Sequence, residues 1–115
     1  MTQLSNMECD VCKTGAPPVS AEDCQQLLAE IPDWELFGAE GTRRLRRKFL
    51  FRNFAESIAF TNQVGEIAEE ADHHPEILTE WGKVTVTWWT HKINGLHLND
   101  FIMATKTDAL SGYQH

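Results

Sequence analysis

A long helical pattern occupies the middle of the chain, from about Asn53 to Ala71. Asn53, followed three residues later by Glu56, is typical of a helix start. Pro75 cannot continue a helix and restricts the residue before it, so the pattern must end near His74. Helical spacing predicts one packed face along this segment. Its expected members are Phe54, Ile58, Thr61, Val64, Ala68 and Ala71, with Ile67 beside them.

Shorter patterns surround this helix on both sides. The expected elements are a helix at about 21–30, a strand near 34–36, a strand at 43–51, strands at about 77–80 and 84–91, and a helix at about 99–110. A tight turn at Trp81-Gly82-Lys83 joins the last two strands. The order helix, strand, strand, helix, strand, strand, helix predicts an α+β fold, a single domain with an antiparallel sheet and its helices on one face.

The first part of the chain differs from the rest. Residues 1–19 show no sustained apolar period, so we expect a flexible N-terminal tail at 1–19 and a folded domain at 20–112. Cys9 and Cys12 have a spacing seen in zinc sites, but a structural zinc site needs four ligands. A third cysteine, Cys24, makes the number of cysteines odd, so we expect free thiols rather than a disulfide framework. Because Cys24 lies in a helical pattern, we expect it to pack in the core.

The charge balance narrows the classes of partner. The chain has 17 acidic and 10 basic side chains, a net charge of −7, which disfavours nucleic acid and anionic membrane surfaces. Five of the basic residues lie between Arg43 and Lys48, which we interpret as a solvated strand face. The sequence has no apolar run of membrane-spanning length and no signal-peptide pattern at its start, so a cytoplasmic location is expected.

Three histidines fall near the end of the long helix and the strand that follows. His73 and His74 precede Pro75, and His91 ends the strand. Glu69 lies one helical turn before His73, so we expect it to contact that ring. Spacing alone fits a functional site and helix capping by histidines equally well. The two other histidines, His97 and His115, are expected to be ordinary surface residues.

These residues carry a family resemblance. The pattern Glu69-x3-His73-His74-Pro75-x5-Trp81-x9-His91-x8-Asp100 resembles the signature of the pterin-4a-carbinolamine dehydratases. The similarity covers about 32–108 and includes Pro32-Asp33-Trp34. Trp88 and Trp89 are bulkier than the residues typical of that strand in the family.

The resemblance implies a fold, a reaction and partners. It implies a four-stranded antiparallel sheet with three helices packed on one face, and self-association into a homodimer or homotetramer. The implied reaction is loss of water from 4a-hydroxytetrahydropterin to give quinonoid dihydropterin, in tetrahydropterin recycling for phenylalanine hydroxylase. The pterin is the substrate, and no metal or organic cofactor is implied. Histidine, with a pKa near ~6.5, suits the acid and base steps of such a dehydration.

The resemblance also implies site residues by position. His73, His74 and His91 match the catalytic histidines, with His73 and His91 expected to transfer protons and His74 to bind the 4a-hydroxyl. The expected substrate-binding residues are Glu69, Pro75, Thr90, Trp34 and Asp100. An acid in the first turn of a helix is also favoured by the helix dipole, so Asp100 has a structural explanation as well.

Two alternatives remain open at this stage. The first is a non-catalytic regulatory or dimerisation module for a hydroxylase or a transcription factor, which would need none of the histidines. The second is a small zinc hydrolase using His73, His91 and Glu69, although His73 and His74 lack the i, i+4 spacing of two ligands on one helical face.

Overall fold

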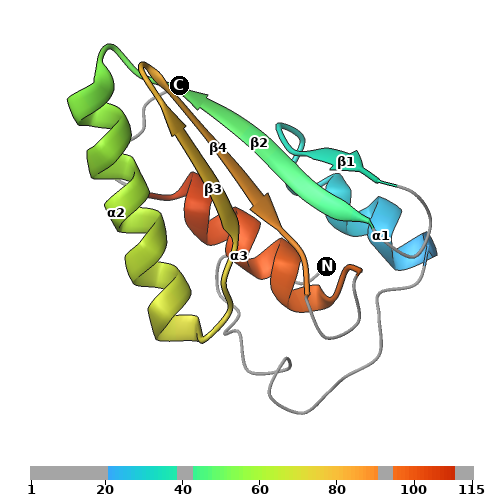
Figure 1. Ribbon diagram of the computed structural model, residues 1–115. Coiled ribbons are helices and arrows are strands. Elements are labelled where there is room, and N and C mark those ends of the chain that lie inside the picture. The colour runs from blue at the N-terminus through green and yellow to red at the C-terminus, as the bar shows by residue number, and fades with distance from the viewer. Residues whose placement is uncertain (1–20, 39–42, 91–94, 111–115) are drawn as a thin grey trace.

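The computed structural model describes residues 21–38, 43–90 and 95–110 (Figure 1). Its elements follow the predicted order: α1 (Ala21–Leu28), β1 (Glu35–Phe37), β2 (Arg44–Leu50), α2 (Phe54–Ala71), β3 (Glu76–Glu80), β4 (Lys83–Trp88) and α3 (Leu98–Asp108). The α+β prediction is confirmed. The proposed tail at 1–19, with Cys9 and Cys12, lies outside the described residues.

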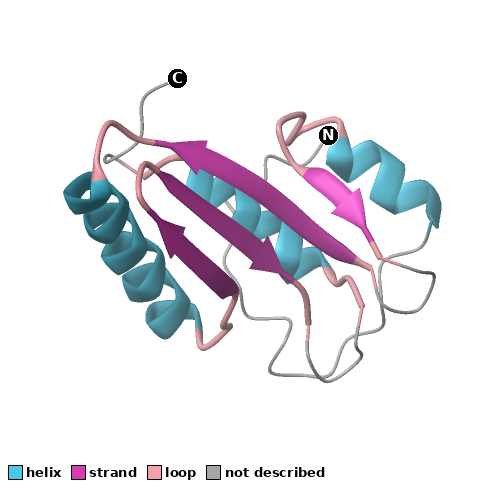
Figure 2. Cartoon of the chain, turned by 45° about the horizontal axis from the view of Figure 1, so that its top comes forward, coloured by secondary structure: helices cyan, strands magenta, loops and turns pink. Residues whose placement is uncertain are grey.

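The four strands form one antiparallel sheet in the order β1-β2-β4-β3 (Figure 2). The register places Leu45 of β2 opposite Trp88 of β4. The predicted tight turn between β3 and β4 is confirmed, since Glu80 pairs with Lys83 across it. Gly82 has φ 70° in this turn, a conformation that glycine adopts without a steric penalty.

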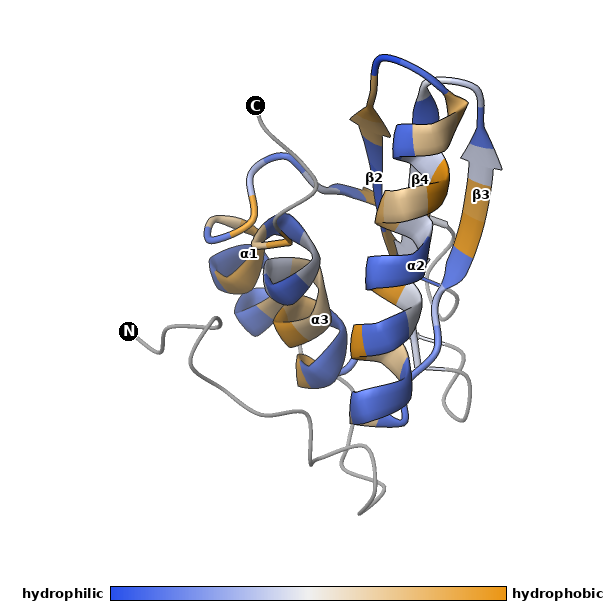
Figure 3. Cartoon of the chain, turned by 90° about the vertical axis from the view of Figure 1, so that its left-hand side faces the viewer, coloured by the Kyte–Doolittle hydropathy of each residue, from blue (hydrophilic) through white to orange (hydrophobic). Residues whose placement is uncertain are grey.

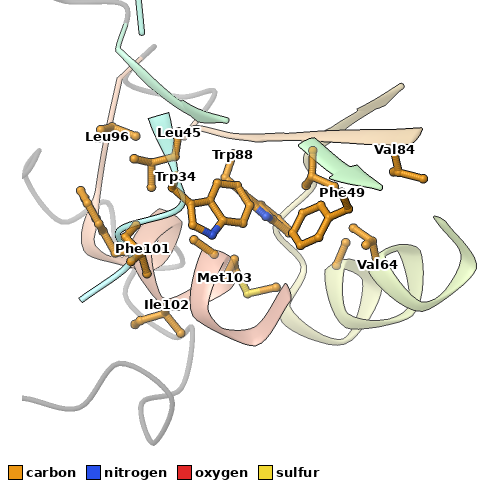
Figure 4. Close-up of a cluster of buried hydrophobic side chains, with 14 of the residues drawn as sticks. Trp34, Leu45, Phe49, Val64, Val84, Trp88, Leu96, Phe101, Ile102 and Met103 are labelled. Carbon is orange, nitrogen blue, oxygen red and sulfur yellow. The ribbon is translucent and has the colours of Figure 1, made fainter. Parts of the chain in front are cut away.

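The sheet has one covered face and one open face. Leu45 and Phe49 of β2 and Val84 of β4 are fully buried on the covered face, whereas Leu50 on the opposite face is 68% exposed. Alternation of this kind is what a half-buried antiparallel strand requires. Figure 3 shows α1 and α3 on one side of the strands. The core contains the side chains labelled in Figure 4, which come from β2, β4, α2 and α3 and, for Trp34 and Leu96, from the segments before β1 and α3.

The start of α2 follows the sequence prediction, and its buried face follows it in part. Asn53 is the N-cap, and its Oδ1 accepts from the Glu56 backbone N–H at 2.9 Å. Val64 and Ala68 are buried and Ile67 and Ala71 pack against the core, as expected. Phe54 and Ile58 were wrongly expected on this face, since they are 46% and 40% exposed, and Ser57 and Phe60 are buried instead. Ser57 can be buried because its hydroxyl bonds to the Asn53 carbonyl at 3.2 Å.

Several smaller expectations can be compared with the structure. Helix α1 ends at Leu28 rather than 30, and β4 ends at Trp88 rather than 91. Cys24 is 5% exposed, as predicted for a core residue, and burial raises the pKa of its thiol. Arg47 departs from the solvated face predicted for the basic strand, because it points inward and is 7% exposed. None of the helices in the described segments has the length and apolarity needed to cross a bilayer.

Candidate active site at the start of α3

The end of α2 separates the two neighbouring histidines. Asp72 adopts a left-handed conformation with φ 53°, and the backbone N–H groups of Asp72 and His73 donate to the last carbonyls of the helix, those of Glu69 and Ala68. This is a common way for a helix to end. Since the chain turns sharply here, His73 is buried at 6% exposure while the His74 side chain is 53% exposed.

His73 is paired with a buried carboxylate that lies 27 residues further along the chain. Its Nε2 lies 2.6 Å from Oδ1 of Asp100, a side chain with no exposed surface. An ionised carboxylate only accepts hydrogen bonds, so the proton of neutral His73 lies on Nε2. This leaves Nδ1 as the ring nitrogen with a free lone pair.

The second oxygen of Asp100 is also fixed. The Thr90 hydroxyl donates to Oδ2 at 2.8 Å, and the His97 backbone N–H donates to the same oxygen at 3.0 Å. The carboxylate therefore has three hydrogen-bond donors from three parts of the chain, which restricts its rotation. Such a network compensates the cost of burying a charge.

His97 has a structural role that the sequence did not reveal. It was predicted to be a surface residue, but it is 2% exposed and is the N-cap of α3. Its Nδ1 accepts from the Asn99 backbone N–H at 3.5 Å, and the Asp100 side chain accepts from the His97 backbone. The usual cap residues are Ser, Thr, Asp and Asn, so residue type gave no signal for this one.

Glu69 contacts His74 and not His73, which corrects the prediction. Its Oε1 lies 3.2 Å from Nε2 of His74, and the Glu69 side chain is 81% exposed. The prediction assumed that the helix continues to His73. Because Asp72 ends the helix in a left-handed turn, the i, i+4 geometry is lost and His73 turns toward α3.

Trp34 belongs to a different part of the molecule. Its Nε1–H donates to Asp108 at 2.9 Å and the ring is 5% exposed. Asp108 lies at the opposite end of α3 from Asp100, about 12 Å away along the helix axis. Trp34 is therefore a buried side chain bound at the C-terminal end of α3, whereas His73 is bound near its start. Its expected role at the rim of the pterin pocket stays a prediction.

The comparisons with known proteins agree with this fold. The family model described as "Pterin 4 alpha carbinolamine dehydratase" matches residues 17–110. The chain belongs to this family. A relative in Nitrosococcus oceani is 57% identical over 110 residues, which cover 96% of this chain and 97% of the relative. Another, in Syntrophotalea carbinolica, is 54% identical over 110 residues, with 96% and 98% covered. Both are named "Putative pterin-4-alpha-carbinolamine dehydratase".

Two solved structures share the fold with this dehydratase-family chain. One, described as a transcriptional coactivator/pterin dehydratase from Brucella melitensis, has a TM-score of 0.72 at 30% identity, covering 81% of this chain and 97% of its own. The other, a pterin dehydratase-like protein described as a RuBisCO assembly factor, has a TM-score of 0.59 at 24% identity, covering 71% of this chain and 93% of its own. At that identity the second shows the fold alone.

The other residues expected at the site lie near the His73 corner or outside the described part, whereas Trp81 of the signature lies in the β3–β4 turn and is 72% exposed. Pro75 connects the end of α2 to β3. Thr90 pairs with Gly95 through an isolated bridge, its N–H donating to the Gly95 carbonyl at 2.9 Å. His91 lies outside the described residues. Within the described segments, no group of three or more His, Cys, Asp or Glu residues is arranged to hold a metal ion.

Proposed function

We propose that this protein removes water from 4a-hydroxytetrahydropterin to give quinonoid dihydropterin, by histidine acid and base catalysis. The observation that carries the proposal is the buried His73–Asp100 pair, with Nε2 and Oδ1 2.6 Å apart. Family membership supports the substrate class, since the family is named for pterin carbinolamine dehydration.

The reaction requires one base and one acid. A proton leaves the ring nitrogen next to carbon 4a, a double bond forms between these two atoms, and the hydroxyl on carbon 4a leaves as water after receiving a proton. His73 is suited to the base role, because Asp100 holds the proton on Nε2 and leaves the Nδ1 lone pair to accept one. The same carboxylate then stabilises the imidazolium that forms, as in other His–Asp pairs.

The other site residues receive roles that fit their surroundings. His74, half-exposed and bonded to Glu69, is proposed to bind the leaving hydroxyl and to exchange its proton with solvent. Pro75 is proposed to keep the backbone rigid directly after the two histidines. Thr90 is assigned to hold Asp100, because its hydroxyl donates to that carboxylate. His91 is proposed as the second proton-transfer group from its position in the family signature.

The wider context of the reaction is also part of the proposal. The product would return to tetrahydropterin by reduction, so the protein would support pterin recycling for phenylalanine hydroxylase. No metal and no organic cofactor is proposed, and we propose that the chain works as a homodimer or homotetramer.

The direct test follows the decay of the carbinolamine. A phenylalanine hydroxylase generates the intermediate, and its ultraviolet absorbance is recorded with and without this protein in the presence of a chelator. The wild-type protein is expected to accelerate the decay, and His73→Gln to lose at least about 100-fold of that acceleration. His115→Gln, beyond the matched family region, serves as the histidine control. A folded wild-type protein that gives no acceleration contradicts the proposal.

A second candidate function is a binding module for a hydroxylase or a transcription factor. It is favoured by the description of the Brucella relative as a coactivator and by the apolar residues Phe54 and Ile58, which are 46% and 40% exposed on α2. The variant His73→Gln distinguishes the two functions. It is expected to lose dehydration activity, whereas a binding module would keep its effect on its partner protein.

A further inference from the structure

The ring of His73 has a second neighbour in addition to Asp100. The indole of Trp88 is stacked on it, with ring centroids 5.7 Å apart and planes inclined by only 8°. This separation falls in the range of offset stacking between aromatic rings. Trp88 is fully buried and projects from β4 into the core, as Figure 4 shows.

Trp88 is itself held in place by α3. Its Nε1–H donates to the Thr107 hydroxyl at 3.1 Å, and that hydroxyl donates to the Met103 carbonyl at 2.7 Å. A hydroxyl has one proton, so its bond to Met103 leaves only lone pairs facing the indole. The direction of the Trp88 hydrogen bond is therefore fixed, and with it the plane of the indole.

One face of α3 thus holds both members of the stack. Asp100 and Thr107 are seven residues apart, close to two helical turns, so they lie on the same side of the helix about 10 Å apart. Asp100 binds His73 near the start of the helix, and Thr107 binds Trp88 near its end. A hydrogen bond at Nε2 fixes the position of that atom but does not specify the plane of the imidazole. The indole, nearly parallel to the ring, lies where it can specify that plane.

We infer that Trp88, fixed by Thr107, is a positioning residue that sets the plane of the His73 ring and hence the direction of Nδ1. Its contribution to catalysis rests on the proposed dehydration, whereas its effect on the ring can be measured without any reaction. Small displacements of a catalytic group can lower rates by about 100-fold, so orientation of this ring is expected to affect turnover.

The first measurement is the set of NOEs from the His73 ring protons in isotope-labelled protein, assigned with a His73→Gln variant. NOEs report the orientation of the ring, whereas its chemical shifts would change with the loss of the indole ring current alone. Trp88→Leu removes the aromatic face and is expected to change the NOEs between the His73 ring and neighbours other than residue 88. Trp88→Phe keeps a stacking face and is expected to change them less. Val84→Ala is the matched control, because Val84 is fully buried on the same strand and face, about 13 Å along β4. It should leave these NOEs unchanged.

The second measurement is turnover of the carbinolamine. Trp88→Leu is expected to lower kcat by roughly 10-fold or more with little change in KM, because orientation acts on the chemical step. Thr107→Val leaves the indole N–H without its acceptor and is expected to lower kcat by a smaller factor, while Thr107→Ser, which restores a hydroxyl, recovers it.

Two results would overturn the inference. One is a Trp88→Leu protein in which the NOEs from the His73 ring to neighbours other than residue 88 are unchanged, and the other is a Val84→Ala protein that loses kcat as Trp88→Leu does. If no variant and no wild-type protein turns over the carbinolamine, the proposed reaction fails, but the change of these NOEs in Trp88→Leu still decides whether Trp88 positions the ring.

Discussion

The two ends of α3 carry aspartates with different partners, one fully buried and one partly exposed. Asp100, near the start, binds His73, Thr90 and the His97 N–H. Asp108, at the end, accepts from Trp34 at 2.9 Å and from Arg47 at 2.7 Å. Arginine and indole keep their protons at all physiological pH values, whereas histidine releases one near neutrality. A carboxylate of the same type is therefore proposed to support proton transfer at one end of the helix, whereas at the other it connects Trp34 and Arg47 to α3.

The largest expected effect comes from Asp100→Asn. The amide keeps the shape of the carboxylate but removes the charge that stabilises the His73 imidazolium, and its NH2 group can impose the other tautomer on the ring. We expect kcat/KM for carbinolamine dehydration to fall by about 100-fold or more. Asp108→Asn is the matched control and should keep activity within about threefold, since Asp108 is about 12 Å from Asp100 along α3. Equal losses in the two variants would remove the distinction between the two ends.

Arg47→Met tests the other end of the helix. It keeps much of the apolar length of the side chain but leaves the Asp108 carboxylate, 26% exposed, without its cationic partner. Breaking a buried pair in this way commonly costs 3–5 kcal/mol, and partial exposure lowers our expectation to about 2 kcal/mol in the free energy of unfolding. Urea denaturation measures it. A variant as stable as the wild type would show that the C-terminal pair contributes no net stability.

A smaller effect is expected in the pH dependence of stability. Burial raises the pKa of Asp108 above its ordinary value of 3.8, against the opposing effects of Trp34 and Arg47. The folded protein therefore holds this proton more tightly than the unfolded chain. The contribution of Asp108 to stability is largest below 3.8 and falls as the pH rises through the folded pKa.

Asp108→Asn should remove this dependence. The unfolding free energies of the wild type and Asp108→Asn are measured by urea denaturation at a series of pH values. As the pH rises above 3.8, the wild type should lose stability relative to Asp108→Asn. If the wild type instead gains stability relative to Asp108→Asn, then Arg47 and Trp34 lower the pKa of Asp108 by more than burial raises it.

The smallest expected change in stability is that of Glu69→Gln. Glu69 and His74 are 81% and 53% exposed, and ion pairs at such positions contribute about 0–1 kcal/mol. We expect unfolding free energy to change by less than about 0.5 kcal/mol. If Glu69 helps to bind the pterin through His74, KM should rise by a few fold while kcat stays nearly constant. A thermal melt and a KM measurement together separate the two effects.

Sequence patterns predicted the elements well because caps and periodicity are local. The Asn53 cap, the Gly82 turn and the order of helices and strands all depend on residues a few positions apart. The site depends on contacts that are remote in sequence. His73 and Asp100 are 27 residues apart, and Trp34 and Asp108 are 74 apart. No spacing rule gives such pairs.

Two local predictions failed for identifiable reasons. The first half of the buried face of α2 was misplaced because Ser57 is polar by type but satisfies its hydroxyl within the helix. The partner of Glu69 was misassigned because Asp72 takes a left-handed conformation, which non-glycine residues adopt infrequently. The family signature indicated which residues gather near the corner, but it could not show that Trp88 lies against the His73 ring.

The position of α3 as the last described element has a consequence for biosynthesis. Strands β1 to β4 are all translated before Asp100, but α3 supplies four core residues without exposed surface, Phe101, Ile102, Met103 and Ala104. The covered face of the sheet and the His73–Asp100 pair are therefore both completed only when α3 docks. Newly made chains would acquire the complete core and the proposed chemistry in the same step.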